Sequence, residues 1–391
     1  TLLFGFSNKY NYQVKKIKLS FKNLPAAFKG MRMVHISDIH SGSFQDIRAV
    51  NKGIDLILKQ QPDLIVFTGD LVNDRATEME PYQNSFGRLT APLGVFSTLG
   101  NHDYGDYVSW DSPEAKKSNF QQLIQVHKKM GWQLLMNEHV VLQRDQDQIA
   151  IVGIENWSAK NRFPKYGNLN KAFSGAAQIP FSILLSHDPS HWRAQVLSNY
   201  PTIALTLSGH THGMQFGIEL PGVRWSPIQY VYAEWAGLYE QLDQKLYVNR
   251  GFGFIGYPGR VGILPEITVI ELFSKDSTIW RPEGVKSEDV LFIFSGAHGI
   301  ANGLDALLDA VNLLVKRNIT GYKIVLIGNG KLKPDLIKRT KLENLGENII
   351  FLDPVPKEKL IGLLKSSDVG LQLLANIPAF YYGTSPNKFF D

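Results

Sequence analysis

Residues 33–40 read MVHISDIH, and this segment indicates the fold class of the chain. Its first part is mostly apolar, as expected of a strand that is buried on both faces of a sheet. The stretch ends in Asp38 and His40, whose carboxylate and imidazole groups are common metal ligands. In open α/β sheets, sites form beyond the carboxyl ends of the strands. The pattern therefore predicts an α/β fold with a site at the end of this strand.

Four later segments repeat this pattern of an apolar run followed by ligand-type residues. The runs are LIVFT at 64–68, VFSTL at 95–99, ILLS at 183–186 and IALTLS at 203–208. The ligand-type residues that follow them are Asp70, Asn101, His102, His187, His210 and His212. Since parallel strands end at one edge of a sheet, we expect two Asp, one Asn and five His residues to gather at one rim. That collection can hold two metal ions and leave one imidazole for proton transfer.

The rest of the first part alternates predicted helices and strands. A stripe of apolar residues predicts a helix over 47–58, and 112–130 has a helical pattern as well. Residues 132–154 read as short strands, and 262–273 as a last strand. The intervening stretch, 213–262, is rich in Gly, Trp and Tyr, and we expect it to form long loops around a site.

A second βα series follows a polar segment that contains Pro282 and Gly284. We predict three parts for the chain: one domain over 1–275, a linker over 276–289 and an incomplete Rossmann-like α/β domain over 290–391. In the last part, the expected strands are 291–294, 323–327, 349–352 and 369–374, and the expected helices are 303–317 and 357–365.

The predicted ligands offer nitrogen and oxygen but no sulfur, because the chain contains no Cys. Mixed nitrogen and oxygen ligation suits Mn, Fe, Zn, Co or Ni. A carboxylate has two oxygens and can bridge two cations. Two ions about 3.5–4 Å apart form the clamp used for in-line displacement at phosphorus. We therefore expect two divalent metal ions as cofactors.

These motifs resemble those of the calcineurin-like metallophosphoesterases. The flanking sequence around the first and last motifs is similar to a bacterial branch that is often membrane-tethered and cleaves phosphodiester or pyrophosphate bonds. The resemblance covers about residues 12–273 and implies a four-layer α/β/β/α sandwich. The matching motifs are Asp38-Ile39-His40, Gly69-Asp70, Gly100-Asn101-His102-Asp103, Ser186-His187 and Gly209-His210-Thr211-His212.

The resemblance also implies a role for each motif residue. One metal ion is held by Asp38, His40 and His212, and the other by Asn101, His187 and His210. Asp70 bridges the two ions, and a hydroxide between them attacks phosphorus. His102 is not a ligand but stands over the leaving group as a general acid, oriented by Asp103.

Two further features of the first part bear on its substrate and its location. Arg250 or Arg260 contacts a second phosphate, or both are solvated residues of a glycine-rich turn. The chain starts at Thr1 on an apolar stretch that lysines follow. This start is either what remains of a membrane anchor or a natural soluble end, so the protein is membrane-associated or cytoplasmic.

The second part contains a glycine-rich turn at 295–303, between a predicted strand and a predicted helix. With 327–331, 367–370 and 382–388, it resembles the nucleotide-sugar half of a GT-B glycosyltransferase. The residues that this resemblance assigns to nucleotide-sugar binding are Gly296, Gly299, Gly328, Gly330 and Lys331. The family's pair of acidic residues is not intact, because Gly383 holds the first position. We leave two interpretations open, a nucleotide-sugar-binding protein and a fold without that activity.

The charge of the chain limits its partners. A net charge of +5 over 391 residues is compatible with a phosphorylated small molecule, a lipid-linked substrate or an anionic membrane surface. It is too weak to indicate nucleic-acid binding. No run of 18 apolar residues occurs in this sequence.

Overall fold

A computed structural model describes residues 2–220, 223–274, 282–286, 288–356, 360, 363–364 and 366–375. The chain divides into two compact units, Thr1–Lys275 and Asp276–Asp391. Each unit is described by itself below. The motif at 382–388, Gly383 and most of the helix expected at 357–365 lie outside the described residues.

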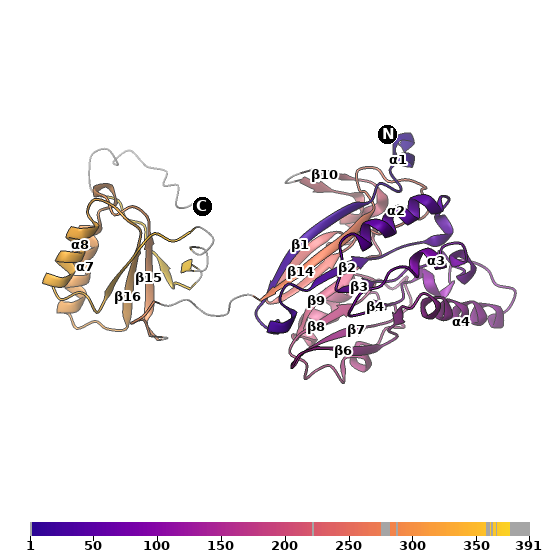
Figure 1. Ribbon diagram of the computed structural model, residues 1–391, viewed down its shortest axis with the longest axis horizontal. Coiled ribbons are helices and arrows are strands. Elements are labelled where there is room, and N and C mark those ends of the chain that lie inside the picture. The colour runs from indigo at the N-terminus through magenta and orange to yellow at the C-terminus, as the bar shows by residue number, and fades with distance from the viewer. Residues whose placement is uncertain are drawn as a thin grey trace. The chain divides into compact units, whose positions relative to one another are not determined.

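The first unit is built on two six-stranded sheets (Figure 1). The first sheet has the order β1-β14-β2-β3-β4-β5. Its strands β2 to β5 are parallel, so their carboxyl ends share one edge. The bounds are β1 Gln13–Phe21, β14 Glu266–Ser274, β2 Arg32–Ile36, β3 Leu64–Phe67, β4 Val95–Ser97 and β5 Gln133–Leu134.

The second sheet has the order β12-β13-β9-β8-β7-β6. Strands β13, β9, β8 and β7 are parallel, and the strands at both edges are antiparallel to their neighbours. The bounds are β12 Gly237–Gln241, β13 Gln244–Val248, β9 Ile203–Ser208, β8 Ser182–Leu185, β7 Asp147–Gly153 and β6 Glu138–Arg144.

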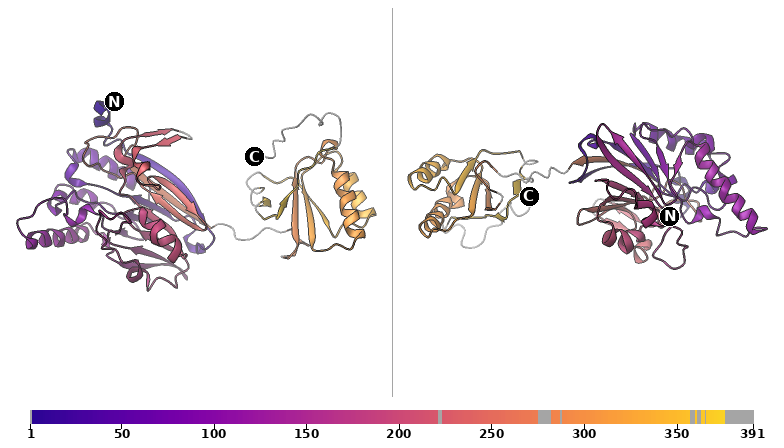
Figure 2. Two further views of the ribbon diagram at one scale, coloured as in Figure 1. Left: turned by 180° about the vertical axis from the view of Figure 1, so that it is seen from behind. Right: turned by 90° about the horizontal axis from the view of Figure 1, so that it is seen from below.

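The two sheets pack face to face and helices cover their outer faces, which makes the four layers that the resemblance implies (Figures 1 and 2). Alternation along β3 shows how the sequence builds them, since Leu64 and Val66 enter the core between the sheets, while Ile65 faces the helices. The helices are α2 Ile47–Leu58, α3 Gln83–Phe86 and α4 Pro113–Lys129 on the first sheet, and α5 Leu169–Phe173 and α6 Leu197–Asn199 on the second.

The two long helices begin where the sequence supplies caps. The Asp46 carboxylate accepts the backbone N–H of Arg48 at the start of α2. The Ser112 hydroxyl caps α4, and a proline takes its first position, where no N–H is needed. These caps fix the two helices within about one residue of the predicted bounds.

The expectation of long loops over 213–262 is wrong in part. This stretch contains β12 and β13, which extend the second sheet, and a hairpin of β10 Ile218–Leu220 and β11 Val223–Trp225. Each of these strands has five residues or fewer, so none shows enough alternation to be recognised in the sequence.

The second unit has a parallel sheet in the order β17-β16-β15-β18. Its helix α7 packs on the strands through Leu304, Leu308 and Val311. The sequence analysis did not predict α8. The bounds are β15 Val290–Ser295, α7 Leu304–Lys316, β16 Tyr322–Ile327, α8 Lys333–Leu342, β17 Ile349–Leu352 and β18 Val369–Gly370.

Candidate metal centre

Loops at the carboxyl ends of β2, β3, β4, β8 and β9 bring the predicted ligands together. The first group consists of Asp38, His40 and His212, whose ligand atoms all lie within 4.8 Å of one another. Asp38 Oδ1 lies 3.3 Å from His212 Nε2, and the side chains of this group are buried. The group therefore combines one carboxylate with two imidazoles from the ends of two different sheets.

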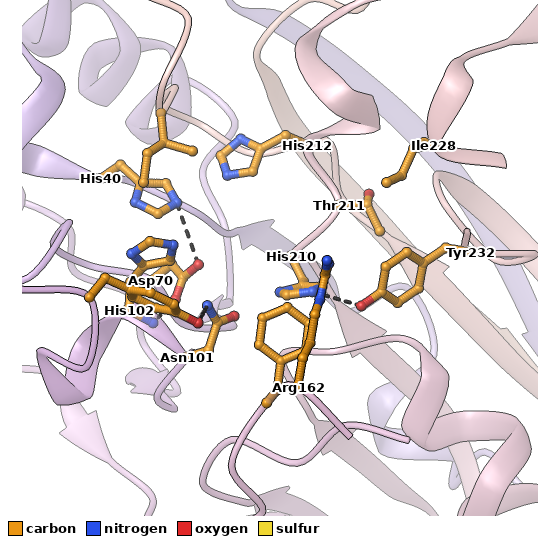
Figure 3. Close-up of a pocket in the computed structure, with 13 residues that line it drawn as sticks. His40, Asp70, Asn101, His102, Arg162, His210, Thr211, His212, Ile228 and Tyr232 are labelled. Carbon is orange, nitrogen blue, oxygen red and sulfur yellow. Dashed lines mark hydrogen bonds and ion pairs between the residues drawn. The ribbon is translucent and has the colours of Figure 1, made fainter. Parts of the chain in front are cut away.

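The second group consists of Asp70, His187 and His210. Asp70 Oδ2 lies 3.2 Å from His187 Nε2 and 3.4 Å from His40 Nε2, so this carboxylate reaches both groups. Figure 3 shows its contact with His40. Burial opposes ionisation of Asp70, but the adjacent His187 and His102 rings hold the pKa of its carboxyl well below the usual range. An ionised carboxylate between two groups of imidazoles is suited to act as a shared ligand of two metal ions.

Four buried side-chain atoms of the candidate ligands have no hydrogen-bond partner among the residues that the structure describes. They are His40 Nδ1, His40 Nε2, His212 Nε2 and Asn101 Oδ1. An unpaired polar atom in a protein interior costs about 1–3 kcal/mol, which a metal ion would remove. Two ligands that each lie about 2.1 Å from one ion are about 3.0–3.4 Å apart. The Asp38–His212 contact of 3.3 Å and the Asp70–His187 contact of 3.2 Å have this spacing. The donor set therefore fits two divalent ions.

The backbone at this rim is held in a conformation that side chains rarely adopt. Left-handed φ values occur at five candidate ligands: Asp38 (53°), His40 (49°), Asp70 (60°), His210 (71°) and His212 (50°). Such residues persist where the surrounding structure imposes them, and they cluster at functional sites. Two glycines make room for the carboxylates, because a Cβ on Gly100 would collide with Asp70, and one on Gly209 with Asp38.

Further contacts fix the orientation of two candidate ligands. The Nδ1–H of His187 donates to the Thr68 carbonyl at 2.8 Å, which leaves Nε2 for a ligand. His210 Nε2 lies 2.9 Å from the Tyr232 hydroxyl, and this hydroxyl donates to Asp188 at 3.1 Å. No sequence motif marked Tyr232 or Asp188 as part of the site.

His102 stands beside the ligands without belonging to either group. Its Nδ1–H donates to the Asn73 carbonyl at 2.8 Å, and its ring lies edge-on to His40 at 4.9 Å and against Tyr107 at 4.4 Å. Burial lowers the pKa of His102 to about 4, although the Asp70 carboxylate opposes this shift. Because Nδ1 is occupied, Nε2 is the atom available to a substrate.

The structure does not support the orienting role expected of Asp103. Its buried carboxylate accepts the backbone N–H groups of Asp70 and Gly100 through one oxygen, and those of Leu71 and Val72 through the other. No hydrogen bond joins it to the His102 ring among the described residues, and the Asn73 carbonyl orients that ring instead. Asp103 therefore positions the loop that carries Asp70.

Arg250 and Arg260 do not line the pocket over the candidate ligands. Arg250 is 2% exposed and pairs with Glu266 and Glu219. Arg260 is fully buried and donates to backbone carbonyls, including that of Gly253. Its guanidinium also lies 3.3 Å from His212 Nδ1. The expectation that either residue contacts a second phosphate is therefore replaced by a structural role for both, because burial removes their guanidinium groups from the pocket.

A pocket of about 450 Å³ opens over the two groups. It is lined by His40, Asp70, Asn101, His102, Tyr107, Arg162, Phe163, His210, Thr211, His212, Ile228, Tyr232 and Ile255 (Figure 3). Tyr107 accepts a 2.9 Å hydrogen bond from Asn101 Nδ2, which leaves Asn101 Oδ1 for a ligand. The sequence analysis did not single out Tyr107, Arg162 or Phe163, because loop side chains such as these carry no periodic signal.

In the second unit, glycines lie where two loops meet. A Cβ on Gly328 would collide with the Gly296 carbonyl, and one on Gly330 with the backbone of His298. A Cβ on Gly299 would have open space, and Lys331 is exposed. Glycine at 328 and 330 is therefore explained by close packing between the loops that follow β15 and β16.

Comparison with known proteins agrees with this geometry. The family model described as calcineurin-like phosphoesterase matches residues 31–214. A metallophosphoesterase of Bacillus subtilis (strain 168), YkuE, is 32% identical over 264 residues, which cover 64% of this chain and 82% of the relative. The chain belongs to this family. All the candidate ligands of the calcineurin-like phosphoesterase unit lie within the matched residues.

Two other relatives extend the comparison. The UDP-2,3-diacylglucosamine pyrophosphatase LpxG of Chlamydia muridarum (strain MoPn / Nigg) is 30% identical over 276 residues, which cover 58% of this chain and 79% of the relative. A Danio rerio protein named transmembrane protein with metallophosphoesterase domain is 29% identical over 269 residues, or 66% of this chain. The chain spans 57% of the length of the Danio rerio relative.

The second unit has a match of its own. A family model described as glycosyl transferases group 1 matches residues 276–374.

In the part of the chain that the structure describes, no helix has the length and apolarity to cross a bilayer.

Proposed function

We propose that residues 1–275 hydrolyse a phosphodiester or pyrophosphate bond with two divalent metal ions. The observation that carries the proposal is the pair of buried ligand groups joined by Asp70 Oδ2, with unpaired donor atoms that point to bound cations. One ion would be held by Asp38, His40 and His212. The other would be held by Asn101, His187 and His210, with Asp70 shared. When bound, the ions supply Lewis-acid stabilisation of the phosphoryl oxygens and a water whose pKa is about 7.

The protein's own residues perform the other tasks. Asp70 and Asp38 neutralise part of the charge of the cations and, with the four imidazoles, fix where a phosphoryl group can lie. His102 presents Nε2 to the pocket because Nδ1 donates to the Asn73 carbonyl. A phosphate anion beside this ring favours the imidazolium form, which donates its Nε2 proton to the leaving oxygen. Tyr107, whose ring lies against that of His102 at 4.4 Å, limits the imidazole to this orientation.

The substrate class is narrowed by the relatives' names. The LpxG relative is named as a pyrophosphatase of a UDP-linked diacyl sugar, which supports a phosphorylated or lipid-linked substrate here. The Danio rerio relative is named as a transmembrane protein, which supports a membrane-associated setting. We therefore include a phosphorylated or lipid-linked substrate and a membrane-associated setting in the proposal for this chain.

Hydrolysis of bis(p-nitrophenyl) phosphate tests the proposal. Metal-stripped protein should be inactive, and Mn²⁺ should restore turnover to the wild-type chain but not to Asp70→Asn. Asp111→Asn is the matched control, since Asp111 is an exposed residue outside the pocket. Equal turnover with and without metal, or an active Asp70→Asn, would refute the two-metal mechanism.

A second candidate function concerns residues 290–391. The match to glycosyl transferases group 1 supports binding of a nucleotide sugar by this unit. UDP should then raise the unfolding temperature of the second unit, whereas uridine should not. No shift at millimolar UDP would favour a fold without this activity.

A further inference from the structure

One cation at the pocket lacks an acidic partner. Arg162 lines the pocket and lies in the loop between β7 and α5. Among the described residues, no carboxylate lies within the 4.0 Å of its guanidinium that would make an ion pair. By contrast, the two arginines of the predicted phosphate contact are buried, and Arg250 is paired with two glutamates. Arg162 is therefore the arginine of this pocket whose charge is available to an anion.

Packing holds Arg162 beside the candidate ligands. The ring of Phe163 lies edge-on to His210, with the centroids 4.9 Å apart. The guanidinium of Arg162 lies over that same ring, 4.5 Å from its centroid. Figure 3 shows Arg162 next to His210 and Tyr232. The stack therefore fixes a positive charge next to the second ligand group.

A second cation belongs to the same loop. The ammonium of Lys160 lies 5.4 Å from the centroid of the Tyr232 ring. The Tyr232 hydroxyl, which contacts His210 and donates to Asp188, also lies within hydrogen-bonding reach of Arg162, but a neutral phenol leaves the positive charge of both cations in place. Among the described residues that line the pocket, Arg162 is the only lysine or arginine. If one anionic group of a substrate lies over the metal ligands, a second anionic group is therefore favoured beside Arg162.

We propose that Arg162 binds the second phosphoryl group of a diphosphate diester, while the first lies over the two ligand groups. The inference rests on the proposed function and narrows it from either bond type to pyrophosphate. The planar fork of Arg suits two oxygens of one phosphoryl group. A single phosphodiester carries one negative charge and has no second group to place there. Hydrolysis forms a P–O bond from water and breaks the bridging P–O bond. It yields two phosphomonoesters, and Arg162 stabilises the charge that develops on the leaving one.

Two small probes isolate this contact, because they differ by one phosphoryl group. Dimethyl phosphate carries one, and the P1,P2-dimethyl ester of methylenediphosphonate carries two with a bridge that water does not cleave. Affinities of the Mn²⁺-loaded full chain for both are measured by calorimetry, without turnover. The wild type should prefer the two-phosphoryl probe, and Arg162→Ala should reduce this preference about 10- to 100-fold.

Two further variants control for charge and for the loop. Arg162→Lys keeps the charge but loses the fork, and should give an intermediate preference. Lys165→Ala changes an exposed cation of the same loop that contacts Trp157 and does not line the pocket, and should leave the preference unchanged. An unchanged preference in Arg162→Ala, or an equal loss of affinity for both probes, would overturn the inference. Failure of the proposed function is separate, since it would appear as no metal-dependent hydrolysis by the wild type.

Discussion

Both units place glycine-containing loops at the carboxyl ends of parallel strands, but these loops have different consequences. In the first unit, Gly100 and Gly209 leave room for carboxylates, and the loops present charged side chains to a pocket. In the second unit, Gly328 lets one loop contact the other, and the Lys333 ammonium donates to the Gly328 carbonyl. Glycine at the end of a strand therefore indicates that another group approaches the backbone closely, whereas the neighbouring side chains decide whether a functional site forms there.

The largest effect should follow removal of the proposed acid. His102→Ala should slow bis(p-nitrophenyl) phosphate turnover about 10²- to 10⁴-fold while the metal content measured by elemental analysis stays the same. His139→Ala is the control, because that ring donates to the Ala172 carbonyl and does not line the pocket. Loss of bound metal from His102→Ala would make His102 a ligand, contrary to this account.

A smaller effect should follow a change behind the ligands. Asp103→Asn replaces one acceptor oxygen by an amide that faces backbone N–H groups, so we expect a loss of about 2–3 kcal/mol of stability. Loosening of the Asp70 loop should also weaken Mn²⁺ binding about 10- to 100-fold. Calorimetric metal titration and thermal unfolding measure both quantities. If turnover fell while metal affinity and stability were unchanged, Asp103 would instead act directly in catalysis.

The packing role of glycine in the second unit can be tested without changing the first unit. Gly328→Ala places a Cβ against the Gly296 carbonyl and should destabilise this unit by about 1–3 kcal/mol. Hydrogen exchange of peptides from 290–356 reports this loss, and hydrolysis should not change. In Gly346→Ala the new Cβ meets nothing within 4 Å, so it is the matched control. Equal exchange in both variants would contradict the packing role of Gly328.

The smallest effect is expected from removal of the second unit. The first unit has its own hydrophobic cores, and all the pocket residues lie in it. A chain that ends at residue 275 should therefore retain kcat and KM for bis(p-nitrophenyl) phosphate within about 2-fold. A large loss of turnover by a folded truncated chain would show that the second unit contributes to hydrolysis.

Periodicity was sufficient for the long elements of the fold. The stripe over 47–58 and the pattern over 112–130 correspond to α2 and α4, because amphipathic helices carry a signal over several turns. The short strands β10 to β13 were missed, since a strand of three to five residues has too few alternations to identify. The same limit explains why the aromatic and glycine content of 213–262 was interpreted as loops.

The site was predictable where the chemistry lies in the side chains of a motif. The residues that follow the apolar runs gather at one rim, because strand ends in a sheet must meet. The partner of His102 was not predictable, since it is the backbone carbonyl of Asn73, which any residue would supply. Arg250 was misinterpreted because its partner Glu266 lies on β14 and is its neighbour only in the fold. Arg162 was missed because only the folded loop brings it to His210.

The number of metal ions bound per chain tests the central claim most directly. Mn²⁺ is titrated into the metal-stripped full chain by calorimetry, and hydrolysis of bis(p-nitrophenyl) phosphate is measured on the same samples. We expect two ions per wild-type chain, with turnover that appears as the sites fill, and weaker metal binding with lost turnover in Asp70→Asn. Fewer than two ions at full turnover, or two ions still bound with full turnover in Asp70→Asn, would contradict a two-metal centre shared through Asp70.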